Sequence, residues 1–129
     1  MIINNWASVA ASEMNDEIVG CGPIMKKLLV DSKQSQGFGV SLVNFSPGSR
    51  LNMHIHKYEQ ILIITDGKGI VATPEKEYVV TPGAVIFIAP GEVHWHGATA
   101  DSSFSHISIS KPGIQLAERK GSYSAAALK

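Results

Sequence analysis

The sequence is poor in cysteine, has no surplus of either charge and contains no long apolar run, and each absence excludes a class of protein. Cys21 is the single cysteine, so an intrachain disulfide is impossible and we expect a cytoplasmic protein in a reducing compartment. Lys and Arg together number 11, as do Asp and Glu, so the chain lacks the basic surplus of nucleic-acid-binding proteins. No apolar run approaches the roughly 20 residues that span a bilayer, and residues 1–17 lack the basic start and apolar stretch of a secretory signal. We therefore expect neither a nucleic acid nor a membrane as a partner.

The chain does contain enough apolar residues for one folded domain. Its 129 residues are 44% hydrophobic and 17% charged, as in globular rather than disordered chains. This length suits a single hydrophobic core. Twelve glycines and six prolines are scattered between the apolar stretches, which favours short strands joined by tight turns.

Nine short apolar or alternating runs follow one another from residue 26 to residue 110. They cover residues 26–30, 38–46, 51–56, 61–65, 69–73, 77–81, 84–88, 93–96 and 104–110. Because no helical pattern separates them, they predict an all-β antiparallel sandwich or closed barrel. We expect an N-terminal arm over residues 1–25, with a short helix or turn near 7–12, and a barrel over 26–112. Residues 113–129 form a C-terminal tail, for which we expect a frayed helix or disorder.

All five histidines lie between positions 54 and 106: His54, His56, His94, His96 and His106. Four of them form two His-x-His pairs, and because strand side chains alternate between faces, both rings of a pair point to the same side. Two imidazoles from one strand, a third from another and the amide oxygen of Gln60 can form one side of a coordination sphere. Imidazole suits Zn, Cu, Fe and Ni, and an amide oxygen suits harder ions such as Mn. A single inward histidine is more often a hydrogen-bonded core residue than a ligand, but two pairs on different strands favour a divalent metal site.

The residues around the two pairs resemble the two motifs of the cupin family. The first motif has its counterpart in Gly48, five residues, His54-Ile55-His56, three residues, Gln60, six residues and Gly67, with Gln60 in place of the usual glutamate. The second has its counterpart in Gly83, five residues, Ala89-Pro90-Gly91, two residues, His94, three residues and Ala98. Here Ala89 replaces a proline and Ala98 replaces an asparagine. The resemblance covers residues 38–109 and implies a single-domain cupin jelly-roll β-barrel.

Within the family, the chain is similar to the small manganese-dependent cupins that include bacterial hydroxynitrile lyases. These proteins carry His-x-His, Gly-Gln, His-Trp-His-Gly-Ala and a histidine on the last barrel strand. This chain matches them except for Glu59, which stands where glycine precedes the glutamine. The resemblance implies that the metal ligands are His54, His56, Gln60 and His94, and that His96 and His106 face the open side of the metal. It also implies manganese, with Fe, Zn, Ni, Co or Cu as alternatives, and a homodimer.

Gln60 affects the chemistry through its charge. Three neutral imidazoles and an amide leave a divalent site with a net charge near +2, whereas a glutamate would leave +1. The more positive centre acidifies a bound hydroxyl more strongly and supports the ferric state less well. We therefore favour Lewis-acid or proton-transfer chemistry over dioxygenation.

Two further histidines and four wall residues complete the predicted site. His106 is the candidate general acid or base, with a fifth ligand or a structural hydrogen bond as the alternative roles. His96 either takes part beside it in the cavity or is held by backbone at the barrel rim. Alternation also directs four side chains into a substrate pocket: Ser41, Val43, Phe45 and Phe104. It leaves Ile107 and Ile109 on an outer apolar face that a partner subunit could cover.

Three functions remain open at this point. The first is a metal-dependent lyase or isomerase that acts on a small molecule, including the hydroxynitrile lyase type. The second is a cupin dioxygenase of the quercetinase type, which would use iron or copper and consume oxygen. The third is a non-enzymatic cupin that binds a metal or a small ligand. The fold alone does not distinguish them.

Overall fold

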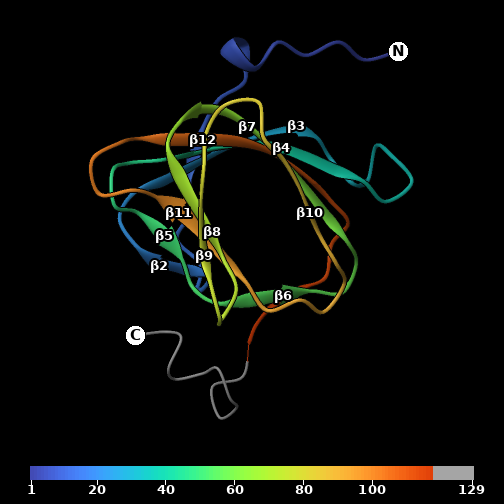
Figure 1. The fold of residues 1–129 in the computed structure, drawn as a ribbon. Coiled ribbons are helices and arrows are strands. Elements are labelled where there is room, and N and C mark those ends of the chain that lie inside the picture. Colours follow the sequence, from blue (N-terminus) through green and yellow to red (C-terminus); the bar gives the residue numbers. More distant parts are fainter. Residues whose placement is uncertain (118–129) are drawn as a thin grey trace.

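The computed structural model describes residues 1–117, in which antiparallel strands wind around a common centre (Figure 1). The first sheet has the order β1-β3-β4-β12-β7-β10, the second has the order β2-β5-β11-β8-β9, and β13 pairs with β6. The strands are β1 (Ser12–Glu13), β2 (Val19–Cys21), β3 (Ile24–Val30), β4 (Gly39–Phe45), β5 (Arg50–Leu51), β6 (His54–His56), β7 (Gln60–Gly67), β8 (Gly69–Ala72), β9 (Glu77–Val80), β10 (Val85–Ile88), β11 (Trp95–Ala98), β12 (Phe104–Ser110) and β13 (Ile114–Leu116). The predicted all-β jelly-roll barrel is confirmed.

Each of the nine predicted runs overlaps a strand, and the run over 51–56 overlaps both β5 and β6. The sheets begin before residue 26 and continue after residue 112, because β1 pairs with β3, β2 with β5 and β13 with β6. The helix expected near 7–12 is a 3-10 turn over Trp6–Ser8, capped by the side chain of Asn5. The expectation of a frayed helix or disorder is wrong for Ile114–Leu116, and its remainder, 118–129, lies outside the described residues. No helix within residues 1–117 is long and apolar enough to cross a membrane.

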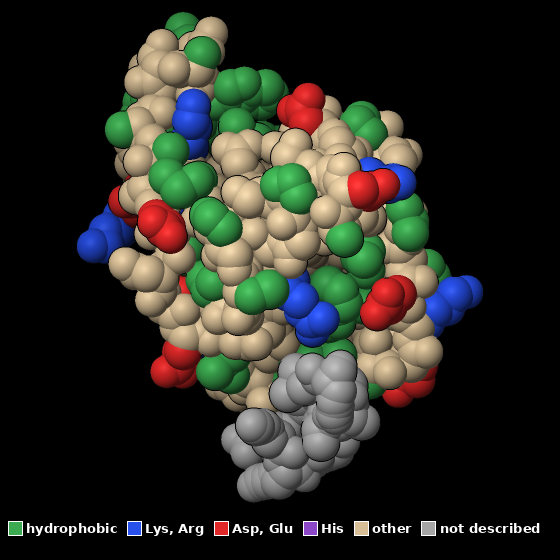
Figure 2. Space-filling model, turned by 90° about the vertical axis from the view of Figure 1, so that its left-hand side faces the viewer, with side chains coloured by type: hydrophobic (Ala, Val, Ile, Leu, Met, Phe, Trp, Pro, Cys, Tyr) green, Lys and Arg blue, Asp and Glu red, His purple; other side chains and the backbone are tan. Residues whose placement is uncertain are grey.

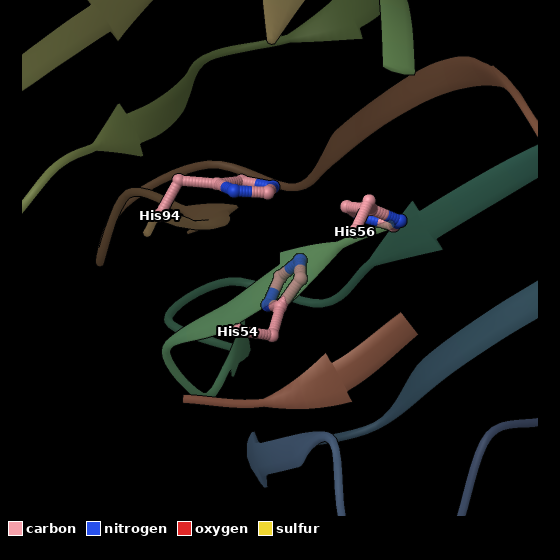
Figure 3. Close-up of side chains that lie close together, drawn as sticks. All are labelled: His54, His56 and His94. Carbon is pink, nitrogen blue, oxygen red and sulfur yellow. The ribbon is translucent and has the colours of Figure 1, made fainter. Parts of the chain in front are cut away.

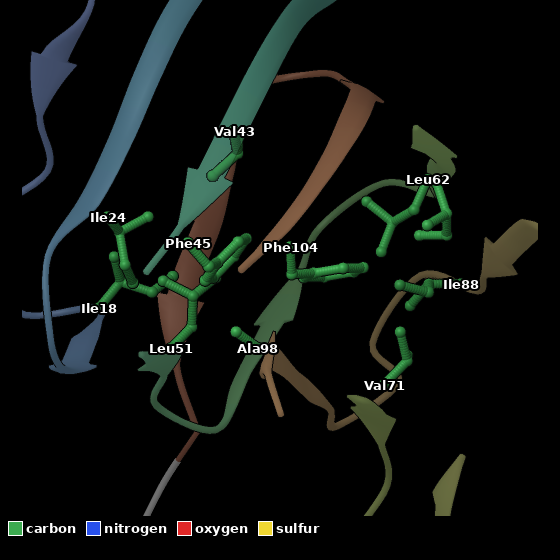
Figure 4. Close-up of a cluster of buried hydrophobic side chains, with 11 residues drawn as sticks. Ile18, Ile24, Val43, Phe45, Leu51, Leu62, Val71, Ile88, Ala98 and Phe104 are labelled. Carbon is green, nitrogen blue, oxygen red and sulfur yellow. The ribbon is translucent and has the colours of Figure 1, made fainter. Parts of the chain in front are cut away.

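The hydrophobic core gathers side chains from both larger sheets inside the barrel (Figure 4). Buried Leu62 and Ile64 of β7 alternate with more exposed neighbours, as expected for a strand with one face in the core. Phe45 and Phe104 are paired across β4 and β12, with ring centroids 5.5 Å apart. These two rings separate the apolar core from the histidine-lined part of the interior.

Gly69 on β8 is expected to be irreplaceable, because a Cβ atom there would lie 2.4 Å from the ring of Phe104. That ring is fully buried and cannot move aside without disturbing Phe45. We expect Gly69→Ala to lower the free energy of unfolding by about 1–3 kcal/mol, the usual cost of overpacking. Urea denaturation measures it. Gly39→Ala is the matched control, since its Cβ would meet no atom closer than 3.6 Å, and an equal loss in both variants would contradict the steric argument.

Candidate metal centre

The strand β6 brings His54 and His56 to the same face, with Ile55 between them on the other side. One edge of β6 pairs with β13, and at the other edge His54 and His94 exchange two backbone hydrogen bonds of 2.9 and 3.1 Å. This pairing sets His94 directly opposite His54, so that their rings lie 4.2 Å apart between centroids. The period-2 spacing and one antiparallel bridge therefore assemble three histidines from two distant segments.

The three imidazoles of His54, His56 and His94 turn toward a common space (Figure 3), and one nitrogen of each lies within 4.8 Å of the others. Three nitrogens that share one first-row ion at metal–nitrogen bonds of about 2.1 Å lie at most about 3.6 Å from one another when equally spaced. The three rings are therefore close enough to share an ion if their side chains move inward as it binds. Figure 2 shows no histidine on the outer face on the side of β2, β5 and β11, in keeping with the burial of all five.

Backbone carbonyl groups fix the orientation of two of these rings. Nδ1 of His54 lies 2.7 Å from the carbonyl oxygen of Asn52, and Nδ1 of His94 lies 2.9 Å from that of Glu92. A carbonyl can only accept, so Nδ1 carries the proton and Nε2 of each ring presents its lone pair. This second-sphere arrangement is the one that metal-binding histidines commonly have.

Burial keeps the three imidazoles neutral. It lowers the pKa of His54 well below the ordinary value, with a further contribution from His94, and it lowers the pKa of His94. It also lowers the pKa of His56 to about 4. At neutral pH their nitrogens are therefore free of the extra proton that would block metal binding.

Gln60, the first residue of β7, has an amide oxygen that is free to act as a donor. Its Nε2 donates to Oγ of Ser108 at 2.9 Å, which leaves Oε1 buried without a hydrogen-bond partner. Nε2 of His54, His56 and His94 is likewise buried and unpartnered among the described residues. Each such atom costs about 1–3 kcal/mol, and a divalent cation would satisfy all four. The residues present thus fit a metal ion, and Glu59 is exposed to solvent, on the side away from them.

His96 and His106 form a second, fully enclosed pair. Nε2 of His106 lies 3.1 Å from Nδ1 of His96, and the outer nitrogens, Nε2 of His96 and Nδ1 of His106, have no hydrogen-bond partner. Burial lowers the pKa of His106 to about 4 and, together with the charge of His106, lowers that of His96 well below the ordinary value. Both rings are therefore neutral at pH 7, and both line the same cavity as His54, His56 and Gln60.

The four side chains of the predicted pocket wall divide between the cavity and the core. The cavity has a volume of about 400 Å³ and is lined by Ser41 and Val43 but not by Phe45 or Phe104. Those two rings belong to the core and pack behind the histidine pair, with centroids 5.4 and 5.6 Å from that of His106. The alternation of side chains along a strand predicts which of them point into the barrel. It does not predict at which residue the core ends and the cavity begins.

Other residues of the cavity were missed. Lys26 lines the wall from β3, and Lys111 and Gly113 line the rim just before β13. A signal for Lys26 exists, because it alternates with Ile24 and so faces inward with it. The sequence around Lys111 and Gly113 does not predict that they line the cavity, because their position depends on the long-range pairing of β13 with β6.

Both the sequence and the fold resemble those of known cupins. Residues 41–110, more than half of the chain, match the cupin domain family. A cupin-like protein of Thermotoga maritima has 32% sequence identity and a TM-score of 0.78, over 91% of this chain and 90% of that one. The polyketide cyclase RemF of Streptomyces resistomycificus has a TM-score of 0.80 at 18% identity, over 92% of this chain and 86% of that one, and shows a shared fold alone.

A third similarity is to a curated enzyme. An (R)-mandelonitrile lyase of Granulicella tundricola is 42% identical over 69 residues, which are 52% of this chain and 52% of that protein. The chain thus matches about half the length of this relative. The matched family region includes both His-x-His pairs, Gln60 and His106, and the chain belongs to the cupin family.

Proposed function

We propose that this protein is a metal-dependent lyase that cleaves or forms a carbon–carbon bond beside a hydroxyl group of a small molecule, as in a hydroxynitrile. One observation carries the proposal: three imidazole nitrogens, buried and without hydrogen-bond partners, lie within 4.8 Å of one another beside a cavity, and that cavity is also lined by Gln60, whose amide oxygen is buried and unpartnered. The cavity volume of about 400 Å³ is near the lower end for ligand pockets, which suits a small substrate. The similarity to a mandelonitrile lyase supports the hydroxynitrile class.

The four donors would hold a divalent cation, manganese in our proposal, through Nε2 of His54, His56 and His94 and Oε1 of Gln60. Such a cation supplies Lewis-acid polarisation of a substrate oxygen. Because all four donors are neutral, no ligand charge offsets that of the cation, which favours loss of a hydroxyl proton. The same uncompensated charge disfavours the ferric state, and so favours a lyase over a dioxygenase.

The His96–His106 pair is proposed to hold and return the proton. One ring must donate across their 3.1 Å contact, so in either tautomer one outer nitrogen carries hydrogen and the other presents a lone pair. In the cleavage direction that lone pair takes the hydroxyl proton while the carbon–carbon bond breaks. The bonding electrons leave with cyanide, the substrate becomes an aldehyde, and the pair returns the proton to give hydrogen cyanide.

The lyase proposal predicts that manganese-loaded protein releases benzaldehyde from racemic mandelonitrile at a rate above that of buffer. Chelation should lower this rate at least about 100-fold, and added Mn²⁺ should restore it. Benzaldehyde is followed by its absorbance, with an oxygen electrode in the same vessel. Release that survives removal of the metal would contradict the proposal, and oxygen uptake coupled to product formation would favour the dioxygenase instead.

We also propose that the protein acts as a homodimer through the outer face of the six-stranded sheet. The registers align two apolar rows there, Val85-Ile63-Ile107 and Phe87-Ile61-Ile109. Val85 is 67% exposed and Phe87 is 61% exposed. A charge-free apolar array of this kind is unusual on an isolated soluble domain and is typical of an interface.

The dimer proposal predicts a mass of about twice 13.8 kDa in light scattering coupled to gel filtration. Phe87→Asp should shift the protein to monomer, since it sets two charges against each other or against apolar side chains across the interface. Val79→Asp is the control, because Val79 is equally exposed, at 64%, on the other sheet. A monomeric wild type, or dissociation in both variants, would contradict the chosen face.

A further inference from the structure

The inner face of the six-stranded sheet carries a charged group that the proposed reaction does not use. β3, β4 and β12 are neighbours, and their registers pair Lys26 with Val43 and Val43 with His106. Paired residues of adjacent strands share a face, so Lys26 stands in one row with His106 and faces the cavity that both line. With strands about 4.8 Å apart, their Cα atoms lie about 10 Å apart.

Lys26 is the charged group of this cavity that has no partner. It is half-buried, and its ammonium group makes no ion pair or hydrogen bond with any residue that the structure describes. The other charged residues of the lining are engaged or exposed. Asp31 accepts a hydrogen bond from the backbone of Lys33, Lys111 lies 5.2 Å from the ring of Tyr58, and Asp16 is open to solvent.

Further polar side chains stand on the same wall beside this row. The next row toward the mouth pairs Ser41 with Ser108, and both hydroxyl groups line the cavity beside Gln60. The lining side chains Lys26 and Lys111 balance Asp16 and Asp31, so the charge of a cation held by neutral donors is not offset within the cavity. Such a wall favours an anionic ligand long enough to reach from the histidines to Lys26.

We propose that the substrate is a hydroxy compound that also carries a carboxylate, which Lys26 binds while the reacting hydroxyl lies at the histidines. This inference rests on the proposed lyase function, and it makes Lys26 a specificity-determining residue. In such a substrate the carboxylate lies at the opposite end from the hydroxyl, because Lys26 and His106 are two strand spacings apart. A para-substituted benzyl alcohol has suitable proportions and is chemically stable.

Isothermal titration with two probes of nearly the same shape tests the inference: 4-(hydroxymethyl)benzoate, which is an anion, and 4-(hydroxymethyl)benzamide, which is neutral. We expect manganese-loaded wild type to bind the benzoate at least 10-fold more tightly than the benzamide. Lys26→Met should reduce this preference at least 5-fold. The matched control is Lys27→Met, since Lys27 lies on the opposite face of β3 and donates to the carbonyl oxygen of Trp6 at 2.8 Å; its preference should equal that of wild type.

Several results would overturn the inference: no preference for the benzoate, no binding of either probe, or a preference that Lys26→Met leaves intact. The last would assign the preference to the cation alone. Repeating the titration after chelation separates this inference from the proposed lyase. One combined outcome is that the protein fails to release benzaldehyde from mandelonitrile and yet retains a preference that depends on Lys26. That pair of results would contradict the lyase proposal and support the carboxylate site.

Discussion

Replacing His54 with alanine is expected to abolish stoichiometric metal binding. Nε2 of His54 is buried without a hydrogen-bond partner, and Nδ1 is held by the carbonyl oxygen of Asn52, so the ring is oriented in advance to present Nε2 as a ligand. We expect about one equivalent of divalent metal per chain in the wild type and at least about 100-fold weaker binding in His54→Ala, a loss of about 2.7 kcal/mol. Elemental analysis of purified protein and Mn²⁺ titration measure it.

Thermal denaturation separates a lost ligand from a lost fold. Because a metal that binds the native state alone stabilises it, Mn²⁺ at 100 times its dissociation constant should add about 2.7 kcal/mol to the wild type. The same concentration should leave the melting temperature of His54→Ala unchanged, while circular dichroism shows an intact β-fold. A folded His54→Ala protein that retains a full equivalent of tightly bound metal would remove the basis of the proposed centre.

The core of this site is readable from the sequence because its geometry is local. Two histidines separated by one residue on a strand must share a face, and this holds for His54 with His56 on β6. The resemblance to the cupin motifs then relates these residues to Gln60, His94 and His106. The structure adds the bridge between His54 and His94, which no local pattern contains.

The parts that were not predicted depend on long-range contacts. β1, β2 and β13 are only two or three residues long, too short for an apolar alternation to be recognisable. They form by pairing with β3, β5 and β6, from which they are separated along the chain. The same limit applies to Phe45 and Phe104. Their inward direction follows from alternation, but their place in the core follows from their mutual contact and from the absence of a side chain at Gly69.

Replacing His106 with alanine should abolish turnover but leave the metal bound, whereas His54→Ala should lose the metal itself. The ring is not part of the three-histidine cluster and is hydrogen-bonded to His96, whose ring stands next to those of His54 and His94 at 5.5 and 5.6 Å between centroids. Positioned proton transfer usually contributes 10²- to 10⁴-fold to a rate, so we expect a loss of that size in benzaldehyde release. Elemental analysis of the same sample should still give about one equivalent of metal, and metal loss would instead assign His106 as a ligand.

The pH profile distinguishes proton transfer by His106 from a structural role. A base must be neutral to accept a proton, so activity is present above its pKa and is lost as the pH falls through it. Burial lowers the pKa of His106 to about 4, and a nearby cation lowers it further. The acid limb of the wild-type profile should therefore lie at or below about pH 4 rather than near 6.5, with the rate flat through neutrality. Protonation of His56, whose pKa is also lowered to about 4, releases the metal in the same pH range, so His106→Gln, which can still hydrogen-bond His96, should lose the rate at every pH. A wild-type limb near 6.5, or a His106→Gln rate equal to that of the wild type, would exclude His106 as the base.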